Sequence, residues 1–324
     1  AKTPSAVDLD IPPEWRQDYL HFLSLVMHLP LAAGEGQTEA HAVRVIEAMQ
    51  QPAARHEELS LVLEAIGRSV LPLIRKLYTS ADPLAAFYAA RAGARLGDDL
   101  AVDVIVGFAG KAGSPIQVPA VQELGHAGRR ERTLPALRAL IDDPNDLVRI
   151  AAYEALRAQG DPAVLTSQQI GGEFTLDLVR SARQYVIYAT RTGEPRVVLF
   201  GQDMGVARPV FFNMPDDLIT LNAAFDDKKL MVFRRIPRTG GVSEPFYVDP
   251  LVRELVTVLA SEPAPDREGK IKGLGLAYGQ VVAVLHRMCK EGHIRAKFVL
   301  QTPPELQRIY EGTVTMGRPD APAE

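Results

Sequence analysis

In the first half of the chain, one pattern of apolar and polar positions occurs twice. LPLIRKLYTSADPLAAFYAARAGARLGD (71–98) is matched without gaps by LPALRALIDDPNDLVRIAAYEALRAQGD (134–161). The copies share these pairs: Leu71/Leu134, Pro72/Pro135, Arg75/Arg138, Leu77/Leu140, Leu84/Leu147, Ala89/Ala152, Ala92/Ala155, Gly97/Gly160 and Asp98/Asp161. Their apolar positions have helical spacing, so each copy predicts two helices.

The interval between these copies is twice about 31.5 residues, which predicts a copy between them and another upstream. The middle copy comprises helices at 100–110 and 114–128, and the upstream pair lies at 38–50 and 56–69. Apolar residues in EWRQDYLHFLSLVMH (14–28) predict an N-terminal capping helix. A helix pair cannot bury its apolar face alone, so we expect the copies to stack into an α-solenoid.

The last copy also shows where its helices end. Pro144 stops the first helix, predicted over 134–141, and Asn145 or Asp146 can cap the second. Gly160 is suited to the left-handed residue that ends a helix. The small side chains of Ala151, Ala152 and Ala155 predict close packing between helices.

In the second half the apolar period changes from 3.6 to 2, which predicts strands. Thr192–Pro195 has the composition of a hairpin turn. Strands are expected at 173–181, 184–192, 195–201, 208–213, 217–224, 229–236 and 296–301, helices at 251–260, 276–292 and 303–311, and an exposed loop at 261–273. This order predicts an α+β domain with a mostly antiparallel sheet.

These changes of pattern divide the chain into three parts. We expect the solenoid with its capping helix at 1–162, the α+β domain at 163–311 and a disordered tail at 312–324. AVLTSQQIGG (163–172) lacks a helical period and ends in paired glycines, so it is the predicted connector.

Composition excludes some classes of protein and leaves others open. The 324 residues are 47% hydrophobic and carry a formal net charge of -4, which makes nucleic acid an unexpected partner. Cys289 is the single cysteine, so no internal disulfide can form. YLHFLSLVMHLPL (19–31) is the best apolar run, and it is shorter than the roughly 18 residues that a membrane span needs.

The last copy resembles a HEAT repeat of the short kind found in bilin lyases and bacterial scaffolds. The signature of that family is an Asp and an Arg that form a hydrogen-bonded ladder along the stack, and Asp143 and Arg149 have its spacing. Ser80 and Ala86 replace them in the first copy, and Gln117 replaces the Arg in the middle copy. The resemblance therefore implies a HEAT-like fold whose ladder is mostly absent.

VIYATRTGEPRVVLFG (186–201) is similar to C-terminal extensions of some flagellar P-ring proteins. This resemblance implies an exported protein in the cell envelope or periplasm, docked onto a larger assembly. A cytoplasmic scaffold is the alternative, and we favour the envelope.

The candidate chemical motifs are isolated. His286, Cys289 and His293 share one helix face but lack a fourth zinc ligand, so we expect neither a metal nor another cofactor. Gly273, Gly275 and Gly279 have a dinucleotide-loop spacing but follow no strand, and close helix packing or a flexible hinge explains them better. Arg129, Arg130 and Arg132 could contact phosphates, although solvated loops give the same composition. No nucleophile motif appears, and a small-molecule ligand stays an open question.

The sequence therefore predicts a non-enzymatic scaffold that binds another protein. The second helices should expose arginine and tyrosine, which are typical of interface anchors. The candidates are Arg91, Arg95, Arg149, Tyr153 and Arg157. The alternative is an enzyme on a HEAT-like scaffold, similar to a bilin lyase or a DNA glycosylase.

Overall fold

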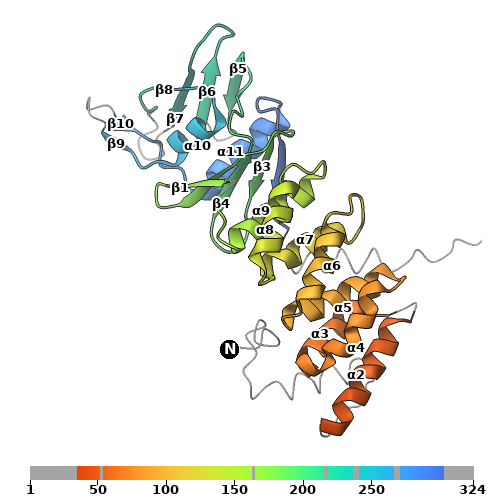
Figure 1. Ribbon diagram of the computed structural model, residues 1–324. Helices are drawn as coiled ribbons and strands as arrows, with labels where there is room; N and C mark the ends of the chain where they lie inside the picture. The colour runs from red at the N-terminus through yellow and green to blue at the C-terminus, as the bar shows by residue number, and fades with distance from the viewer. Residues whose placement is uncertain are drawn as a thin grey trace, which may run out of the picture. The chain divides into compact units, whose positions relative to one another are not determined.

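The computed structural model describes residues 35–51, 54–162, 165–214, 218–235, 241–265 and 271–302. The chain divides into two compact units, residues 1–162 and 163–324, which we call the helical unit and the sheet unit. Figure 1 follows both units from red at the N-terminus to blue at the C-terminus.

The helical unit is a series of helix pairs. Its first pair is α2 (Glu35–Met49) and α3 (His56–Ile66). The next pair opens with the short α4 (Leu71–Ile74), flanked by the 3-10 segments Arg68–Val70 and Arg75–Thr79, and continues with α5 (Pro83–Arg95). The remaining helices are α6 (Asp99–Ala109), α7 (Gln117–His126), α8 (Arg130–Leu140) and α9 (Asp146–Ala158).

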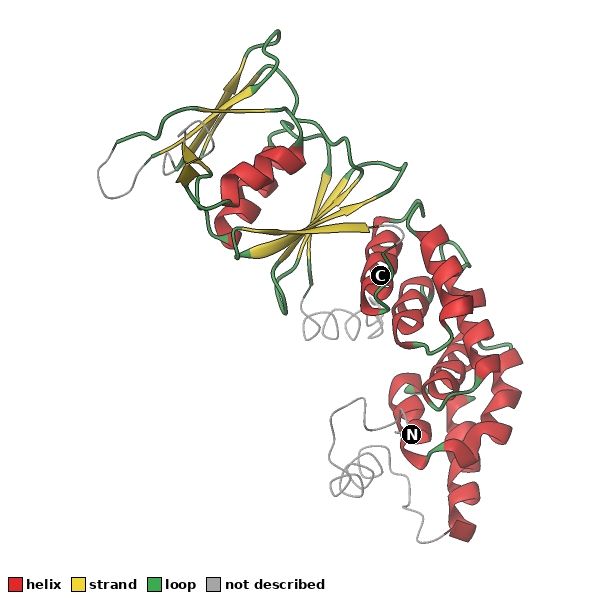
Figure 2. Cartoon of the chain, turned by 60° about the vertical axis from the view of Figure 1, so that its left-hand side comes forward, coloured by secondary structure: helices red, strands yellow, loops and turns green. Residues whose placement is uncertain are grey.

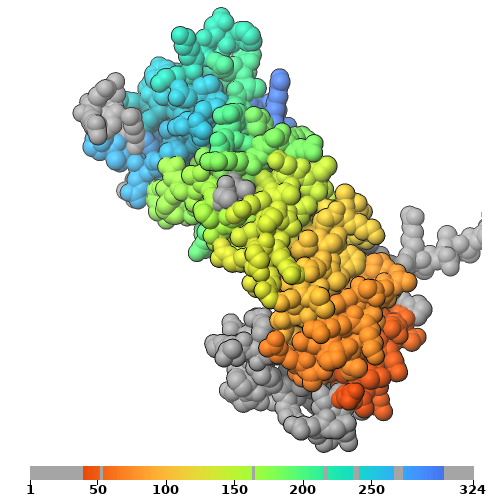
Figure 3. Space-filling model, viewed as in Figure 1, coloured from red at the N-terminus to blue at the C-terminus, as the bar shows by residue number. Residues whose placement is uncertain are grey.

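The second helix of each pair packs against the second helix of the next pair, α3 on α5, α5 on α7 and α7 on α9. In the space-filling view of Figure 3, the atoms of the helical unit, coloured red to yellow, form one continuous surface on the side shown. Small residues allow this close packing, as predicted. Ala152 and Ala155 are buried, and a Cβ on Gly125 would lie 3.0 Å from the Cα of Ala155.

The predicted ends of the helices are largely confirmed. The side chain of Asn145 accepts a hydrogen bond from the Leu147 N–H at 3.0 Å and caps α9. Gly160 ends that copy with φ +64°. However, α8 starts at Arg130 and includes Pro135, so the start predicted at residue 134 was too late.

The HEAT-type ladder differs from the sequence-based expectation. The Gln117 side-chain amide donates to Asp143 at 3.2 Å and to the Ala109 carbonyl at 3.2 Å. The guanidinium of Arg149 donates to Asp146 at 3.2 Å. We expected no ladder contact at residue 117, because glutamine stands there in place of arginine. Gln117 nevertheless makes the ladder hydrogen bond to Asp143 of the next repeat.

A second set of links explains two of the repeated sequence positions. Arg75 donates two hydrogen bonds to Asp98, each of 3.0 Å, and Arg138 donates two to Asp161, of 2.7 and 2.9 Å. Both carboxylates are buried and their arginines are about half exposed. Each pair ties the first helix of a copy to the chain that leaves its second helix.

The sheet unit contains two main sheets. The five-stranded sheet has the order β1-β2-β4-β3-β11, with β2/β4 and β3/β11 parallel and the other pairs antiparallel. Its strands are β1 (Leu165–Ile170), β2 (Phe174–Val179), β3 (Val186–Ala189), β4 (Arg196–Phe200) and β11 (Lys297–Leu300). The mostly antiparallel pairing predicted from the sequence is confirmed, but the strands form two main sheets, one mixed and one antiparallel, in place of one.

The antiparallel sheet has the order β5-β6-β7-β8. Its strands are β5 (Val210–Asn213), β6 (Ile219–Ala223), β7 (Leu230–Arg234) and β8 (Phe246–Val248). Figure 2 shows the helices of this unit, α10 (Val252–Ala260) and α11 (Tyr278–Lys290), between the two sheets. One apolar core contains residues from both sheets and both helices.

Some expectations need correction, and others concern residues outside the described part of the chain. The predicted connector contains strand β1, and the predicted loop at 261–273 contains the ribbon of β9 (Ala264–Pro265) and β10 (Ile271–Lys272). Gly273 packs closely against the backbone that follows α10, because a Cβ there would meet the Ser261 carbonyl. The expected capping helix, the helix at 303–311 and the tail lie outside the described residues.

Candidate interaction surfaces

The five predicted partner-binding residues lie on second helices, Arg91 and Arg95 on α5 and Arg149, Tyr153 and Arg157 on α9. Their exposure differs from the prediction. Arg149 is 1% exposed and Tyr153 is 0% exposed, so these two side chains are not surface anchors in this structure. A spacing of four residues identifies a helix face but does not say which face is covered.

Arg91 and Arg95 are part of a network of charges that crosses three second helices. Arg95 on α5 forms a two-bonded pair with Glu123 on α7, at 2.8 and 3.0 Å, and lies 3.7 Å from Glu64 on α3. Arg91 lies 3.2 Å from Glu123 and 3.6 Å from Glu57. We call these five residues the charge network.

Burial strengthens the interactions inside the charge network. The side chains of Arg91, Arg95 and Glu123 are largely buried and Glu64 is almost fully buried. Burial raises the pKa of Glu64, and the attraction of Arg95 and Arg91 only partly offsets it, while Glu123 adds repulsion. Arg91, Arg95 and Glu123 thus link α5 to α7, and Glu57, with 47% of its side chain exposed, lies at the edge of the network.

The sequence contained a signal for this network. Glu64 and Arg95 are 31 residues apart, and Arg91 and Glu123 are 32 residues apart, which is one repeat period in each case. Residues one period apart lie beside each other on stacked repeats, so opposite charges at that spacing predict ion pairs between helices.

Arg157 is the most exposed of the predicted anchors. Its side chain is 38% exposed, and its Nε lies 3.3 Å from Glu154 on the same helix. Arg157 is therefore the predicted anchor that offers the most side-chain surface to a partner.

Arg129 and Arg132, considered above as phosphate contacts, both face carboxylates of α6. Arg129 donates two hydrogen bonds to Asp99, and Arg132 donates one to Asp103. The hydrogen bonds from Arg129 hold the pKa of Asp99 below its usual value. These pairs tie α6 to the start of α8, and a phosphate would have to displace a carboxylate from each guanidinium.

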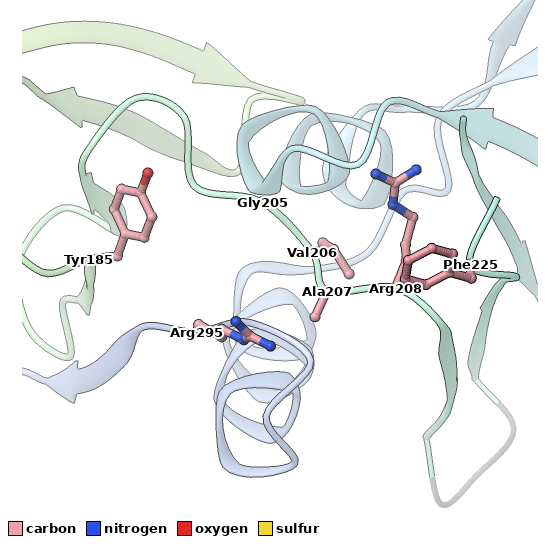
Figure 4. Close-up of a pocket in the computed structure, with 7 residues that line it drawn as sticks. All are labelled: Tyr185, Gly205, Val206, Ala207, Arg208, Phe225 and Arg295. Atoms are coloured by element: carbon pink, nitrogen blue, oxygen red, sulfur yellow. The ribbon is translucent and has the colours of Figure 1, made fainter. Parts of the chain in front are cut away.

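A pocket of about 490 Å³ lies in the sheet unit, and Figure 4 shows its lining. The backbone from Gly205 to Arg208 crosses it, and Tyr185 and Phe225 stand at opposite ends. Arg295 enters from the segment after α11, and Arg208 donates to the Asp227 carbonyl. These arginine, aromatic and backbone groups could contact a ligand, but the lining contains no pair of groups for acid–base catalysis.

His286 and Cys289 lie on α11, but the helix ends at Lys290, so His293 does not share the predicted helix face. The His286 ring lies 5.1 Å from that of Phe298, and His293 Nε2 is 3.4 Å from Glu291. Burial raises the pKa of the Cys289 thiol to about 11, so it is not a reactive thiolate at neutral pH. Within the described part of the chain, no three His, Cys, Asp or Glu residues are grouped as metal ligands.

Comparison with known proteins identifies part of the helical unit. Residues 115–167 match the family model of HEAT repeats. The match covers α7, α8 and α9, so the chain carries HEAT-like repeats. No curated protein and no solved structure matches the chain. None of its described helices is both long enough and apolar enough to cross a bilayer.

Proposed function

We propose that this protein is a non-enzymatic scaffold whose HEAT-like repeats form an α-solenoid and bind another protein. The observation that carries the proposal is the row of second helices, α3, α5, α7 and α9, which pack in series. HEAT repeats are commonly protein-interaction scaffolds, and such a row presents one continuous face. The ion pairs of Arg91 and Arg95 with Glu123 support the proposal because they link two helices of the row, α5 and α7, before a partner arrives.

Exposed members of this row provide the test. Glu57→Lys and Arg157→Glu change charges at opposite ends of the row, where the side chains are 47% and 38% exposed. Lys111→Glu, at an exposed residue between α6 and α7, is the matched control. The readout is recovery of co-purifying proteins on the intact chain, quantified by mass spectrometry and repeated with the purified partner.

We expect the partner to bind the wild type and Lys111→Glu equally, and to bind the other two variants several-fold more weakly. Equal recovery by all four proteins would remove the second-helix row as the binding surface. Variants at Arg149 and Tyr153 are unsuitable, because these residues are buried and their replacement would unfold the helix.

The envelope location expected from residues 186–201 is an extension of this proposal that rests on the resemblance alone. A captured partner from an envelope assembly would support it, and a cytoplasmic partner would contradict it. The enzyme alternative, similar to a bilin lyase or a DNA glycosylase, requires converging acids in a pocket. The lining shown in Figure 4 does not favour it.

A further inference from the structure

The antiparallel sheet β5–β8 has one covered face and one open face. Side chains alternate along its strands, so that Val210 and Phe212 of β5 are buried and Phe211 between them is 71% exposed. The covered face belongs to the core with α10 and α11, which lie on that side in Figure 2. The other face is directed away from both helices.

Residues in register form one row across the open face. Phe211 of β5 pairs with Asn222 of β6, Asn222 pairs with Met231 of β7, and Met231 pairs with Tyr247 of β8. Cross-strand partners on one face lie about 5 Å apart, so these four side chains are direct neighbours. Phe211 and Tyr247 are 71% and 63% exposed. We call Phe211, Asn222, Met231 and Tyr247 the open-face row.

Two lysines adjoin this row at the β6–β7 turn. Asn222, Met231 and Tyr247 line a pocket of about 470 Å³ together with Lys228, Lys229 and Asp227. Both lysines are exposed, and neither has a carboxylate partner among the described residues. The Asp227 carboxylate accepts the Ala224 N–H at 2.6 Å, which commits it to the turn.

We propose that the open-face row binds an extended acidic peptide segment of a partner protein. An aromatic or large apolar side chain of the peptide packs against Met231 and Tyr247, and its carboxylates reach Lys228 and Lys229. The Asn222 amide can donate to a peptide carbonyl and accept from a peptide N–H. Exposed Phe, Tyr and Met are typical of protein interfaces, and the unpartnered lysines supply complementary charge.

This site goes beyond the proposed function, because it lies on the other unit and names a different recognition chemistry. A single-stranded nucleic acid also stacks on aromatic residues, but it needs a cationic groove that follows its backbone. The open face offers two lysines beside Asp226 and Asp227, which is too little positive charge for such a track. A peptide with a few carboxylates matches the two lysines.

Selection from a display library of short random peptides on the intact protein tests the proposal. Selected peptides are synthesised with a fluorescent label, and their affinities are measured by anisotropy at low and high salt. The test variants are Tyr247→Ser and the double variant Lys228→Glu/Lys229→Glu. Leu100→Ser is the matched apolar control, since Leu100 on α6 is 54% exposed and lies outside the row. Lys290→Glu, at an exposed lysine at the end of α11, is the matched charge control.

We expect the selected peptides to combine acidic residues with an aromatic or large apolar residue. Each test variant should weaken their binding by about tenfold or more, which is the cost of losing an interface anchor. Both controls should bind as the wild type does, and added salt should weaken binding because the lysines are exposed. All the replaced side chains lie on the surface, and an unchanged melting temperature verifies that each variant is folded.

Three results would overturn the proposal. The first is a selection that yields no peptide, or only peptides without acidic residues. The second is binding that both test variants retain. The third is tighter binding of a thymidine oligonucleotide than of any peptide, with the same variants abolishing it. Each result leaves the second-helix row untouched, so this proposal and the proposed function fail independently.

Discussion

The contacts between repeats in the helical unit differ from the open face of the sheet unit in how their charges are paired. In the helical unit, arginines such as Arg75, Arg95 and Arg138 each face a carboxylate of another helix or of the chain leaving it. In the open face of the sheet unit, Lys228 and Lys229 have no such partner among the described residues. Paired charges hold stacked repeats in register, whereas unpartnered charges are available to another molecule.

The two units also differ in where large apolar side chains are exposed. Each of the matched repeats exposes a leucine, Leu84 or Leu147, in the first turn of a second helix. The sheet unit exposes Phe211 and Tyr247 in one cross-strand row. Phe211 and Tyr247 thus share one face of the sheet, which is why we propose a recognition site there in addition to the one on the repeats.

The largest expected effect separates the two faces of one strand. Phe212→Ala should lower the free energy of unfolding of the sheet unit by about 4 kcal/mol, because the side chain is 1% exposed in the core. Phe211→Ala, one residue earlier, should cost less than about 1 kcal/mol. Hydrogen exchange of β5 to β7 in the intact chain measures both. If the two variants lost similar amounts of unfolding free energy, the open face would be packed like the core, and the contrast between the two faces of the sheet would be wrong.

The next effect tests whether the paired charges hold the repeats. Asp98→Ala removes the acceptor for Arg75, for the Tyr78 hydroxyl at 2.8 Å and for the Leu100 N–H. Loss of one partner of a buried pair leaves the other uncompensated, and we expect the helical unit to lose about 3 kcal/mol. Hydrogen exchange of α5 and α6 measures this loss.

Asp99→Ala is the matched control for Asp98→Ala, because its pair with Arg129 is exposed. We expect it to have a smaller effect on the same amides. Equal effects of the two variants would mean that burial does not distinguish the links between repeats from surface pairs.

The sequence predicted the elements better than their partners. Helical period, the Asn145 cap and the glycine ends located α9, and alternation located β5 to β7. The order in which the strands pair could not be predicted from the sequence, because no hairpin joins β2 to β4 or β3 to β11. Strand β1 was missed because its centre, Ser167 to Gln169, is polar and exposed and shows no apolar alternation.

The surface residues were predicted less well, for a related reason. A stripe such as Arg149 and Tyr153 shows which side chains share a helix face, but burial depends on what packs against that face. The open-face row could not be read from the sequence, because it joins single residues of four strands through their register. Contacts between residues far apart in the sequence determine both the burial of Arg149 and Tyr153 and the composition of the open-face row.

Acidification should weaken the helical unit through Asp98. Burial is the largest single influence on the pKa of Asp98 and raises it, but hydrogen bonds from Arg75, Tyr78 and the Leu100 N–H together hold it below the ordinary 3.8. A carboxyl group with a lowered folded pKa stabilises the fold above its unfolded pKa and loses this contribution as pH falls through the folded value. Protection of α5 and α6 from hydrogen exchange should therefore decline below pH 3.8. In Asp98→Asn the protection of α5 and α6 should be lower at neutral pH and should change less on acidification. Parallel pH profiles of the variant and the wild type would show that Asp98 does not cause the decline.

The smallest effect concerns Glu64, and its sign is opposite. Burial raises the pKa of Glu64 despite Arg95 and Arg91, so its charged form opposes folding at neutral pH. Glu64→Gln should therefore raise the melting temperature of the helical unit by about 2 °C, which corresponds to a gain below 1 kcal/mol. The gain should shrink as pH falls through the raised pKa, because the wild-type carboxyl group then becomes neutral.

Glu57→Gln, at the exposed edge of the charge network, should leave the melting temperature unchanged. A loss of stability in Glu64→Gln at neutral pH would show that its attraction to Arg95 outweighs its burial, and that the network holds the repeats together at this residue as well.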